Sequence, residues 1–159
     1  MHGVHAATVR FCLARLKNME VSIPELEHHG DLHTCSSAVI IREGKILLGL
    51  RHYTPDKWKT ISVWTTPGGR CEAGESVGDG LRRETSEETG ITSLTVRRFL
   101  GEVSGMAELD TLWVFLCETT EEPTLMEPEK FSDWKWFPLA ELPENFINPS
   151  LAQLLVDTI

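Results

Sequence analysis

One stretch of 23 residues, GGRCEAGESVGDGLRRETSEETG at positions 68–90, constrains the fold of this 159-residue chain more than any other. Ser76 and Asp79 fit the capping pattern of a helix start, in which a serine is followed three residues later by an acid. Gly90 provides the residue that commonly ends a helix, because glycine adopts the left-handed conformation without strain. The stretch therefore predicts a glycine-containing loop that leads into a helix ending at Gly90.

Three glutamates crowd the end of this helix: Glu84, Glu87 and Glu88. Side chains three and four positions apart share a helix face, and at an effective dielectric of ~20 each like-charge pair repels by roughly 3 kcal/mol before salt screening. The helix dipole disfavours anions in the last turn by a further ~0.3–1 kcal/mol each. Either the cluster is a solvated acidic face, or a hard divalent cation such as Mg²⁺, which prefers oxygen ligands, belongs there.

The spacing of the whole stretch resembles the Nudix box, GX5EX7REUXEEXGU, in which U is a bulky aliphatic residue. Gly69 is followed after five residues by Glu75, and after seven more by RETSEETGI at positions 83–91. Every fixed position of the pattern is present. The one departure is Thr85, where the family has an aliphatic residue, and it concerns packing under the helix rather than the metal site. The wider likeness covers roughly residues 34–159.

This resemblance implies a fold, a cofactor and a reaction. The fold would be of the α/β (α+β) class, a mixed β-sheet sandwiched between α-helices. Family members use a metal-activated water to attack a phosphorus of a nucleoside diphosphate linked to a group X. The positions that match the family's ligands for Mg²⁺, or Mn²⁺ as a substitute, are Gly69 (through its carbonyl), Glu84, Glu87 and Glu88. The positions that match its structural ion pair are Glu75 and Arg83.

The proton acceptor in this family is sometimes a box glutamate and sometimes a carboxylate from a later loop. Glu127 and Glu129 both precede the predicted strand around Trp136, and the spacing favours Glu129. The catalytic residues expected from the sequence are therefore the three box glutamates and Glu129.

Further candidates for substrate binding come from the segment before the box and from the later loop. Arg51 matches a position where family members often place a cation near substrate phosphates, although it could equally be a surface arginine. His52 could touch a phosphate, and Trp58 or Trp64 could stack on a base rather than pack in the core. Glu127 completes this set.

The tail, EPEK followed by SDWKWFPLAELP, looks like that of MutT-type enzymes, which convert (deoxy)nucleoside triphosphates to monophosphate and pyrophosphate. Neither the SQPWPFPxS pattern of NADH-cleaving members nor the LLTxR pattern of coenzyme A members is present. The sequence therefore favours a nucleoside triphosphate as substrate. The alternatives are an RNA 5′-pyrophosphohydrolase, a nucleotide-sugar or ADP-ribose hydrolase, and a nucleotide-sensing domain without catalysis.

Composition excludes several other classes. The net charge of −9 argues against a broad duplex nucleic-acid interface, and no apolar run approaches the ~18–20 residues of a membrane span. The four cysteines form no CxxC pair, so we expect reduced thiols in a cytoplasmic protein. The resemblance implies a small-molecule nucleotide substrate, and it leaves open whether the protein forms a homodimer. Residues 1–19 are expected to be a poorly ordered arm, and residues 20–159 the Nudix hydrolase domain.

Around the box, the pattern predicts strands, helix, strands, helix, which indicates mixed α/β layers. A hairpin is expected in residues 34–52, with its turn at Glu43-Gly44. A polar loop is expected to follow it and to end in a short strand near residues 63–65. The later expected elements are a strand over 91–104, an apolar central strand over 111–119, a strand and turn from Trp134, and a closing helix capped by Asn148-Pro149 or Ser150.

Overall fold

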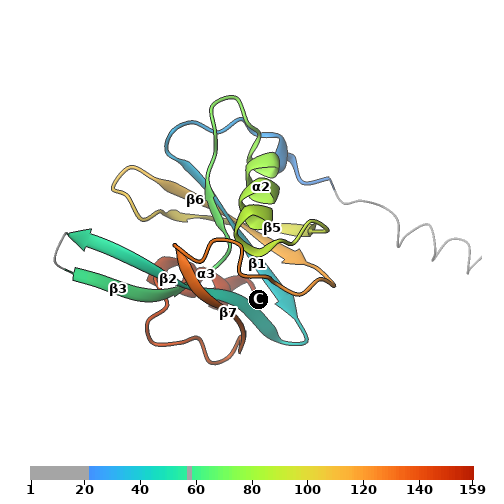
Figure 1. Ribbon diagram of the computed structural model, residues 1–159. Helices are drawn as coiled ribbons and strands as arrows, with labels where there is room; N and C mark the ends of the chain where they lie inside the picture. Colours follow the sequence, from blue (N-terminus) through green and yellow to red (C-terminus); the bar gives the residue numbers. More distant parts are fainter. Residues whose placement is uncertain (1–21, 57–58) are drawn as a thin grey trace, which may run out of the picture.

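A mixed β-sheet with a helix on each face forms the body of the protein (Figure 1). The structure is a computed structural model that describes residues 22–56 and 59–159. The predicted N-terminal arm and Trp58 lie outside these residues. In chain order the elements are η1 (Pro24–Glu27, a 3₁₀ turn), β1 (Thr34–Arg42), β2 (Lys45–Asp56), β3 (Lys59–Thr65), β4 (Gly68–Arg70), α2 (Val77–Thr89), β5 (Thr95–Ser104), β6 (Thr111–Glu118), β7 (Phe131–Pro138) and α3 (Pro149–Thr158).

The strands follow the order β3-β2-β1-β6-β5, and β4 and β7 pair with β1 and β2 respectively. The pairing of β1 with β6 is parallel, whereas the other strand pairs are antiparallel. The central position expected for the apolar strand over 111–119 is therefore confirmed. Within the described part of the chain, no helix is long and apolar enough to cross a membrane.

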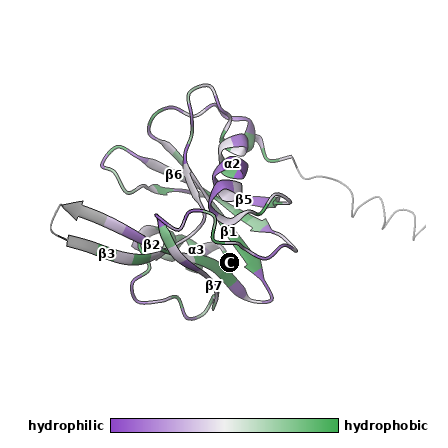
Figure 2. Ribbon diagram, viewed as in Figure 1, coloured by the Kyte–Doolittle hydropathy of each residue, from purple (hydrophilic) through white to green (hydrophobic). Residues whose placement is uncertain are grey.

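Two hydrophobic clusters lie on opposite faces of the sheet. Ala38 packs with Leu81 of α2 in one cluster, and Val39 packs with Leu151 of α3 in the other. This division follows from the strand geometry, because successive side chains of β1 point to opposite faces. Figure 2 shows that α2 is largely hydrophilic, and its buried residues accordingly include the polar Thr85, Glu88 and Thr89 as well as Val77 and Leu81. The predicted class, a mixed sheet between helices, is confirmed.

Local signals located the first hairpin correctly. Glu43 and Gly44 both have positive φ angles, 49° and 73°, as the two central residues of a type I′ turn require. The polar loop predicted after this hairpin is wrong, however, because β2 continues to Asp56 and β3 begins at Lys59. Backbone pairing between β2 and β3, for example of Tyr53 with Ile61, continues through the segment that the polar composition predicted to be a loop.

The helix ends lie where the sequence predicted them. Ser76 Oγ accepts a hydrogen bond from the Asp79 amide at 3.1 Å, and Gly90 ends α2 with a φ of 73°. Asn148 caps α3 by accepting a hydrogen bond from the Leu151 amide at 3.1 Å. The strand predicted from residue 91 begins only at Thr95, because Glu121 accepts the amides of residues 92 and 93.

Candidate functional site

The box joins the sheet through two glycines that leave no space for a side chain. A Cβ on Gly68 would lie 2.0 Å from the carbonyl oxygen of Ser36, and Gly68 has a φ of 147°. A Cβ on Gly69 would lie 2.5 Å from Cδ of Glu84. The absence of both side chains lets β4 pair with β1 and lets the Glu84 carboxylate approach the backbone of the loop.

Glu88 is the most buried of the three box glutamates. Its Oε2 accepts a hydrogen bond from the Gly68 amide at 3.0 Å, and its Oε1 lies 3.8 Å from Nη1 of Arg51. Burial raises the pKa of Glu88 to about 8, although the Gly68 hydrogen bond and Arg51 act in the opposite direction. An additional positive charge beside Glu88 would therefore strongly stabilise the ionised form of its carboxylate.

Arg83 connects the loop to the helix and to two box glutamates. Its Nε and Nη2 bind the two oxygens of Glu75 at 2.8 and 3.0 Å, and its Nη1 lies 2.9 Å from Glu84 and 3.2 Å from Glu87. Its Nη2 also donates to the carbonyl of Arg70 at 3.1 Å. The hydrogen bonds from Arg83 hold the pKa of Glu75 below its ordinary value. Glu75 and Arg83 thus form the ion pair that braces the loop against α2.

The box residues offer the oxygen ligands that a hard divalent cation prefers, namely carboxylates and a backbone carbonyl. Across residues 22–56 and 59–159, no three acidic, histidine or cysteine side chains already converge on one point that could hold a metal ion. Glu88 is directed to Gly68, whereas Glu84 and Glu87 are directed to Arg83. The chemistry of the donor set fits Mg²⁺.

The later loop brings Glu127, rather than Glu129, toward the box. The Glu127 side chain is only 16% exposed and pairs with Lys130, and its charge contributes to the raised pKa of Glu88. The amides of Lys130 and Phe131 both donate to the Glu127 carbonyl at 3.0 Å, which makes a tight turn over these residues. Glu129 is exposed on this turn. The spacing argument for Glu129 therefore finds no support in the geometry.

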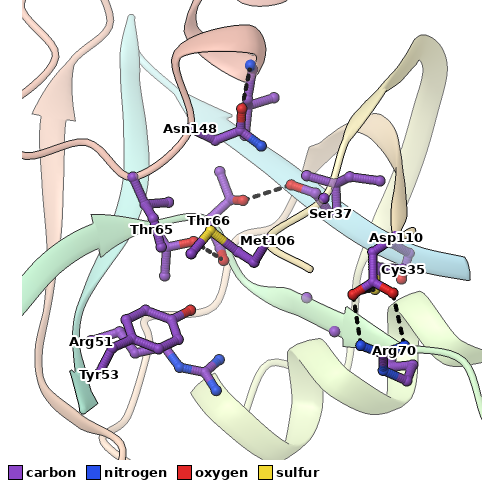
Figure 3. Close-up of a pocket in the computed structure, with 17 residues that line it drawn as sticks. Cys35, Ser37, Arg51, Tyr53, Thr65, Thr66, Arg70, Met106, Asp110 and Asn148 are labelled. Atoms are coloured by element: carbon purple, nitrogen blue, oxygen red, sulfur yellow. Dashed lines mark hydrogen bonds and ion pairs between the residues drawn. The ribbon is translucent and has the colours of Figure 1, made fainter. Parts of the chain in front are cut away.

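A cleft of about 280 Å³ opens beside the box (Figure 3). Its walls come from β1, the ends of β2 and β3, the box loop, the turn between β5 and β6, and the start of α3. Arg51 lies at the cleft, with its guanidinium 4.8 Å from the ring centre of Tyr53 and 5.4 Å from that of Phe131. Residues of the cleft that sequence reasoning missed include Ser37, Tyr53, Thr66, Met106, Asp110 and Asn148.

Two other predicted substrate contacts lie away from this cleft. His52 is exposed, its Nδ1 lies 2.7 Å from the Ser62 hydroxyl, and it alternates with the cleft residues Arg51 and Tyr53 on β2. Trp64 packs edge-on against Phe137 at 4.6 Å, in the cluster on the α3 face. Neither side chain lines the cleft, so stacking of a base on Trp64 is not supported.

Comparison with known proteins identifies the family of this chain. A family model described as NUDIX domain matches residues 31–157. The chain belongs to the NUDIX domain family. The Nudix resemblance drawn from the box is therefore confirmed, and so is the corresponding fold class.

Named relatives of this NUDIX chain include plant and bacterial hydrolases. It is 36% identical over 90 residues to Nudix hydrolase 6 of Arabidopsis thaliana, covering 53% of this chain and 31% of the relative. It is 32% identical over 117 residues to the NAD-capped RNA hydrolase NudC of Mannheimia succiniciproducens, covering 69% of this chain and 43% of the relative. The chain thus spans less than half the length of these relatives.

The fold also resembles a solved structure of similar length. The crystal structure of a MutT NUDIX hydrolase from Burkholderia pseudomallei aligns with a TM-score of 0.66 at 26% identity, covering 82% of this chain and 99% of that one. The arrangement of sheet and helices described above is therefore that of a NUDIX domain with few additions.

Proposed function

We propose that this NUDIX protein hydrolyses a phosphoanhydride bond in a nucleoside di- or triphosphate derivative, with Mg²⁺ as the cofactor. The observation that carries the proposal is the complete box beside a cleft, with Glu84 against Gly69, Glu88 against Gly68 and Arg51 beside Glu88. The names of the relatives, which are hydrolases, agree with this reaction class.

Four groups would hold the cation: the carbonyl of Gly69 and the side chains of Glu84, Glu87 and Glu88. A bound Mg²⁺ supplies charge neutralisation for the phosphates and lowers the pKa of a coordinated water. Arg83 keeps the loop and helix at a fixed separation through its two bonds to Glu75. Such positioning and electrostatics account for most of the catalysis of phosphoryl transfer.

Two side chains next to the box have roles of their own in this proposal. Arg51 binds a substrate phosphate, and the rings of Tyr53 and Phe131 restrict its guanidinium to the cleft side of β2. Glu127 accepts the proton of the attacking water, because it is the largely buried carboxylate of the later loop, whereas Glu129 is exposed on the turn. Lys130 pairs with Glu127 and so fixes the position of that carboxylate on the turn.

The size of the cleft favours a substrate with one nucleoside. At about 280 Å³ it is slightly smaller than most ligand sites, which span roughly 300–1,000 Å³. One base and ribose fit such a space, whereas a second nucleoside would remain outside it. We therefore infer that the reaction is conversion of a (deoxy)nucleoside triphosphate to a monophosphate and pyrophosphate, in a cytoplasmic protein.

A second candidate is hydrolysis at the 5′ end of capped RNA. It is favoured by the similarity to NudC, which is named an NAD-capped RNA hydrolase. The absence of the SQPWPFPxS pattern weighs against it, and so does the net charge of −9, which disfavours long polyanions.

The test is a substrate panel with Mg²⁺ and with Mn²⁺: nucleoside triphosphates, nucleotide sugars, ADP-ribose and a short NAD-capped RNA, with products identified by mass. Glu88→Gln should lower kcat at least about 100-fold, since it removes a metal-binding charge but keeps the shape of the side chain. Glu118→Gln, on the exposed end of β6, is the matched control and should retain full activity.

Two results would contradict the proposal. Wild-type turnover by Glu88→Gln would show that the metal role assigned to the box is wrong. Tight nucleotide binding by the wild-type protein without any turnover would indicate a nucleotide sensor instead. Faster cleavage of the capped RNA than of every free nucleotide would favour the second candidate.

A further inference from the structure

The turn between β5 and β6, residues 105–110, forms one wall of the cleft. Gly105, Met106 and Asp110 all line it. Met106 is 62% exposed, so its side chain is available to a bound molecule. Figure 3 shows Met106 at the cleft and Asp110 facing Arg70 at one end of it. The contacts that hold this turn in place therefore also set the width of the cleft.

Asp110 is the anchor of the turn. Its carboxylate is only 4% exposed and accepts two hydrogen bonds from Arg70, Nη1 to Oδ1 at 2.9 Å and Nη2 to Oδ2 at 2.6 Å. Its backbone closes the turn, because the Asp110 amide donates to the Ala107 carbonyl at 3.0 Å and its carbonyl accepts the Gly105 amide at 2.8 Å. His33 Nδ1 lies 3.4 Å from Oδ1.

Arg70 links this anchor directly to the box. It follows Gly69 in β4, and its carbonyl accepts a hydrogen bond from Nη2 of Arg83 at 3.1 Å. Its guanidinium also donates to the carbonyl of Leu32. A continuous chain of polar contacts thus runs from the β5–β6 turn through Asp110, Arg70 and Arg83 to the loop and helix of the box.

The geometry of the pair differs from that of an ordinary surface ion pair. Two parallel N–H···O bonds fix both the distance and the orientation of the partners, which a lysine in place of arginine cannot do. The carboxylate is buried, whereas Arg97 and Glu118, a comparable pair at the far ends of β5 and β6, are 55% and 52% exposed. The Arg70 side chain is itself 47% exposed, so the burial is that of the carboxylate; a two-point contact to a buried carboxylate is suited to holding a turn in place.

We propose that Asp110 and Arg70 are positioning residues, which hold the β5–β6 turn against the box and so set the cleft for the part of the substrate that lies beyond the reacting phosphates. This proposal rests on the proposed function. Neither residue takes part in the bond breaking. Their effect is on the fit of the bound substrate, which the box itself does not control.

The test compares Asp110→Asn and Arg70→Lys with wild type, using the best nucleotide of the panel and Mg²⁺. Both variants should raise KM about 10- to 100-fold and change kcat by less than about 3-fold, since they loosen substrate fit but leave the box intact. Arg70→Lys keeps the positive charge but cannot make two parallel hydrogen bonds to the carboxylate. A raised KM in this variant therefore distinguishes positioning from simple charge pairing. The double variant should be no worse than either single one.

A second measurement does not depend on activity. Hydrogen exchange at the amides of Gly105, Asp110 and Thr111 should become at least about 10-fold faster in both variants, while α2 amides stay protected. Glu118→Gln and Arg97→Lys, which alter the exposed pair, should change neither KM nor exchange at these amides.

The proposal is overturned if KM and the exchange rates stay within about 2-fold of wild type, or if kcat falls while KM is unchanged. Loss of α2 protection would also overturn it, because the pair would then support the whole fold rather than the turn. If the wild-type protein hydrolyses no nucleotide, the proposed function fails. The exchange rates, together with the Kd for an α,β-methylene nucleoside triphosphate with Mg²⁺, then still decide whether the pair positions the cleft.

Discussion

Thr85 offers a direct test of how the box helix packs, because it can be compared with a second buried threonine in the same helix whose hydroxyl is hydrogen-bonded. Thr85 stands where the box pattern has an aliphatic residue, and it is fully buried. Within the described residues its hydroxyl has no hydrogen-bond partner. Thr89, one turn later, is equally buried, but its hydroxyl donates to the Thr85 carbonyl at 2.6 Å and accepts the Ile91 amide at 3.2 Å.

Replacing each threonine by valine should therefore change stability in opposite directions. A buried hydroxyl without a partner costs about 1–3 kcal/mol, so Thr85→Val, which keeps the branched shape, should raise the free energy of unfolding by about 1 kcal/mol. Thr89→Val removes two hydrogen bonds and leaves the buried Ile91 amide unpaired, so it should lower that free energy by about 2 kcal/mol. The two variants should differ by about 3 kcal/mol.

Urea unfolding followed by tryptophan fluorescence measures both changes in one experiment. For a chain of this length each kcal/mol corresponds to a shift of about 2–4 °C in Tm, which calorimetry can check independently. Helix propensity does not distinguish the two substitutions, because each exchanges threonine for valine. A loss of stability in Thr85→Val would refute the reasoning, since it would mean that the hydroxyl has a favourable partner after all.

Three further predictions concern backbone space, a thiol and pH. Gly68→Ala should lower the free energy of unfolding by about 3 kcal/mol, because its Cβ meets a β1 carbonyl at 2.0 Å. Gly74 also has a positive φ, 77°, but its Cβ would lie in open space, so Gly74→Ala should cost only about 1–2 kcal/mol, and equal losses in urea unfolding would contradict this. Burial, and then the Asp110 carboxylate, raise the pKa of the Cys35 thiol to about 11. Its alkylation at pH 8, followed by peptide mass, should therefore run at roughly a thousandth of the rate reached when the thiol is fully ionised. A rate that levels off below pH 9 would contradict this. Glu75 has a lowered pKa in the folded protein, so its ion pair stabilises the fold fully above the ordinary carboxyl pKa of 4.5, and that contribution is lost as the pH falls through the lower folded value. Urea midpoints of Glu75→Gln should therefore fall less steeply than those of wild type below pH 4.5, and parallel curves would count against the argument.

The sequence predicted those features whose signals are local. Ser76 and Gly90 define the ends of the box helix through their own backbone and side-chain chemistry, and the Glu43-Gly44 turn specifies its hairpin. The box spacing was informative for the same reason, since it lies within one loop and one helix.

The cleft could not be predicted, because its walls meet only through the pairing of distant strands. Tyr53, Asp110 and Asn148 share no spacing in the sequence, and each is an ordinary residue in its own segment. Spacing in the sequence could not decide between Glu127 and Glu129 for a related reason. Which carboxylate faces the box is decided by a single turn, and spacing in the sequence does not reveal how that turn is oriented.

The parallel pairing of β1 with β6 has a consequence for how the protein is made. β1 is the strand with which β4 of the box loop pairs. Another neighbour of β1 in the sheet, β6, comes after the box, α2 and β5 along the chain. Contacts between such distant segments form late, because a long loop must be closed before they are gained. During synthesis, the box would therefore leave the ribosome long before the sheet that orders it is complete. A chain released before β6 would carry all three glutamates of the box and still lack the sheet that positions them.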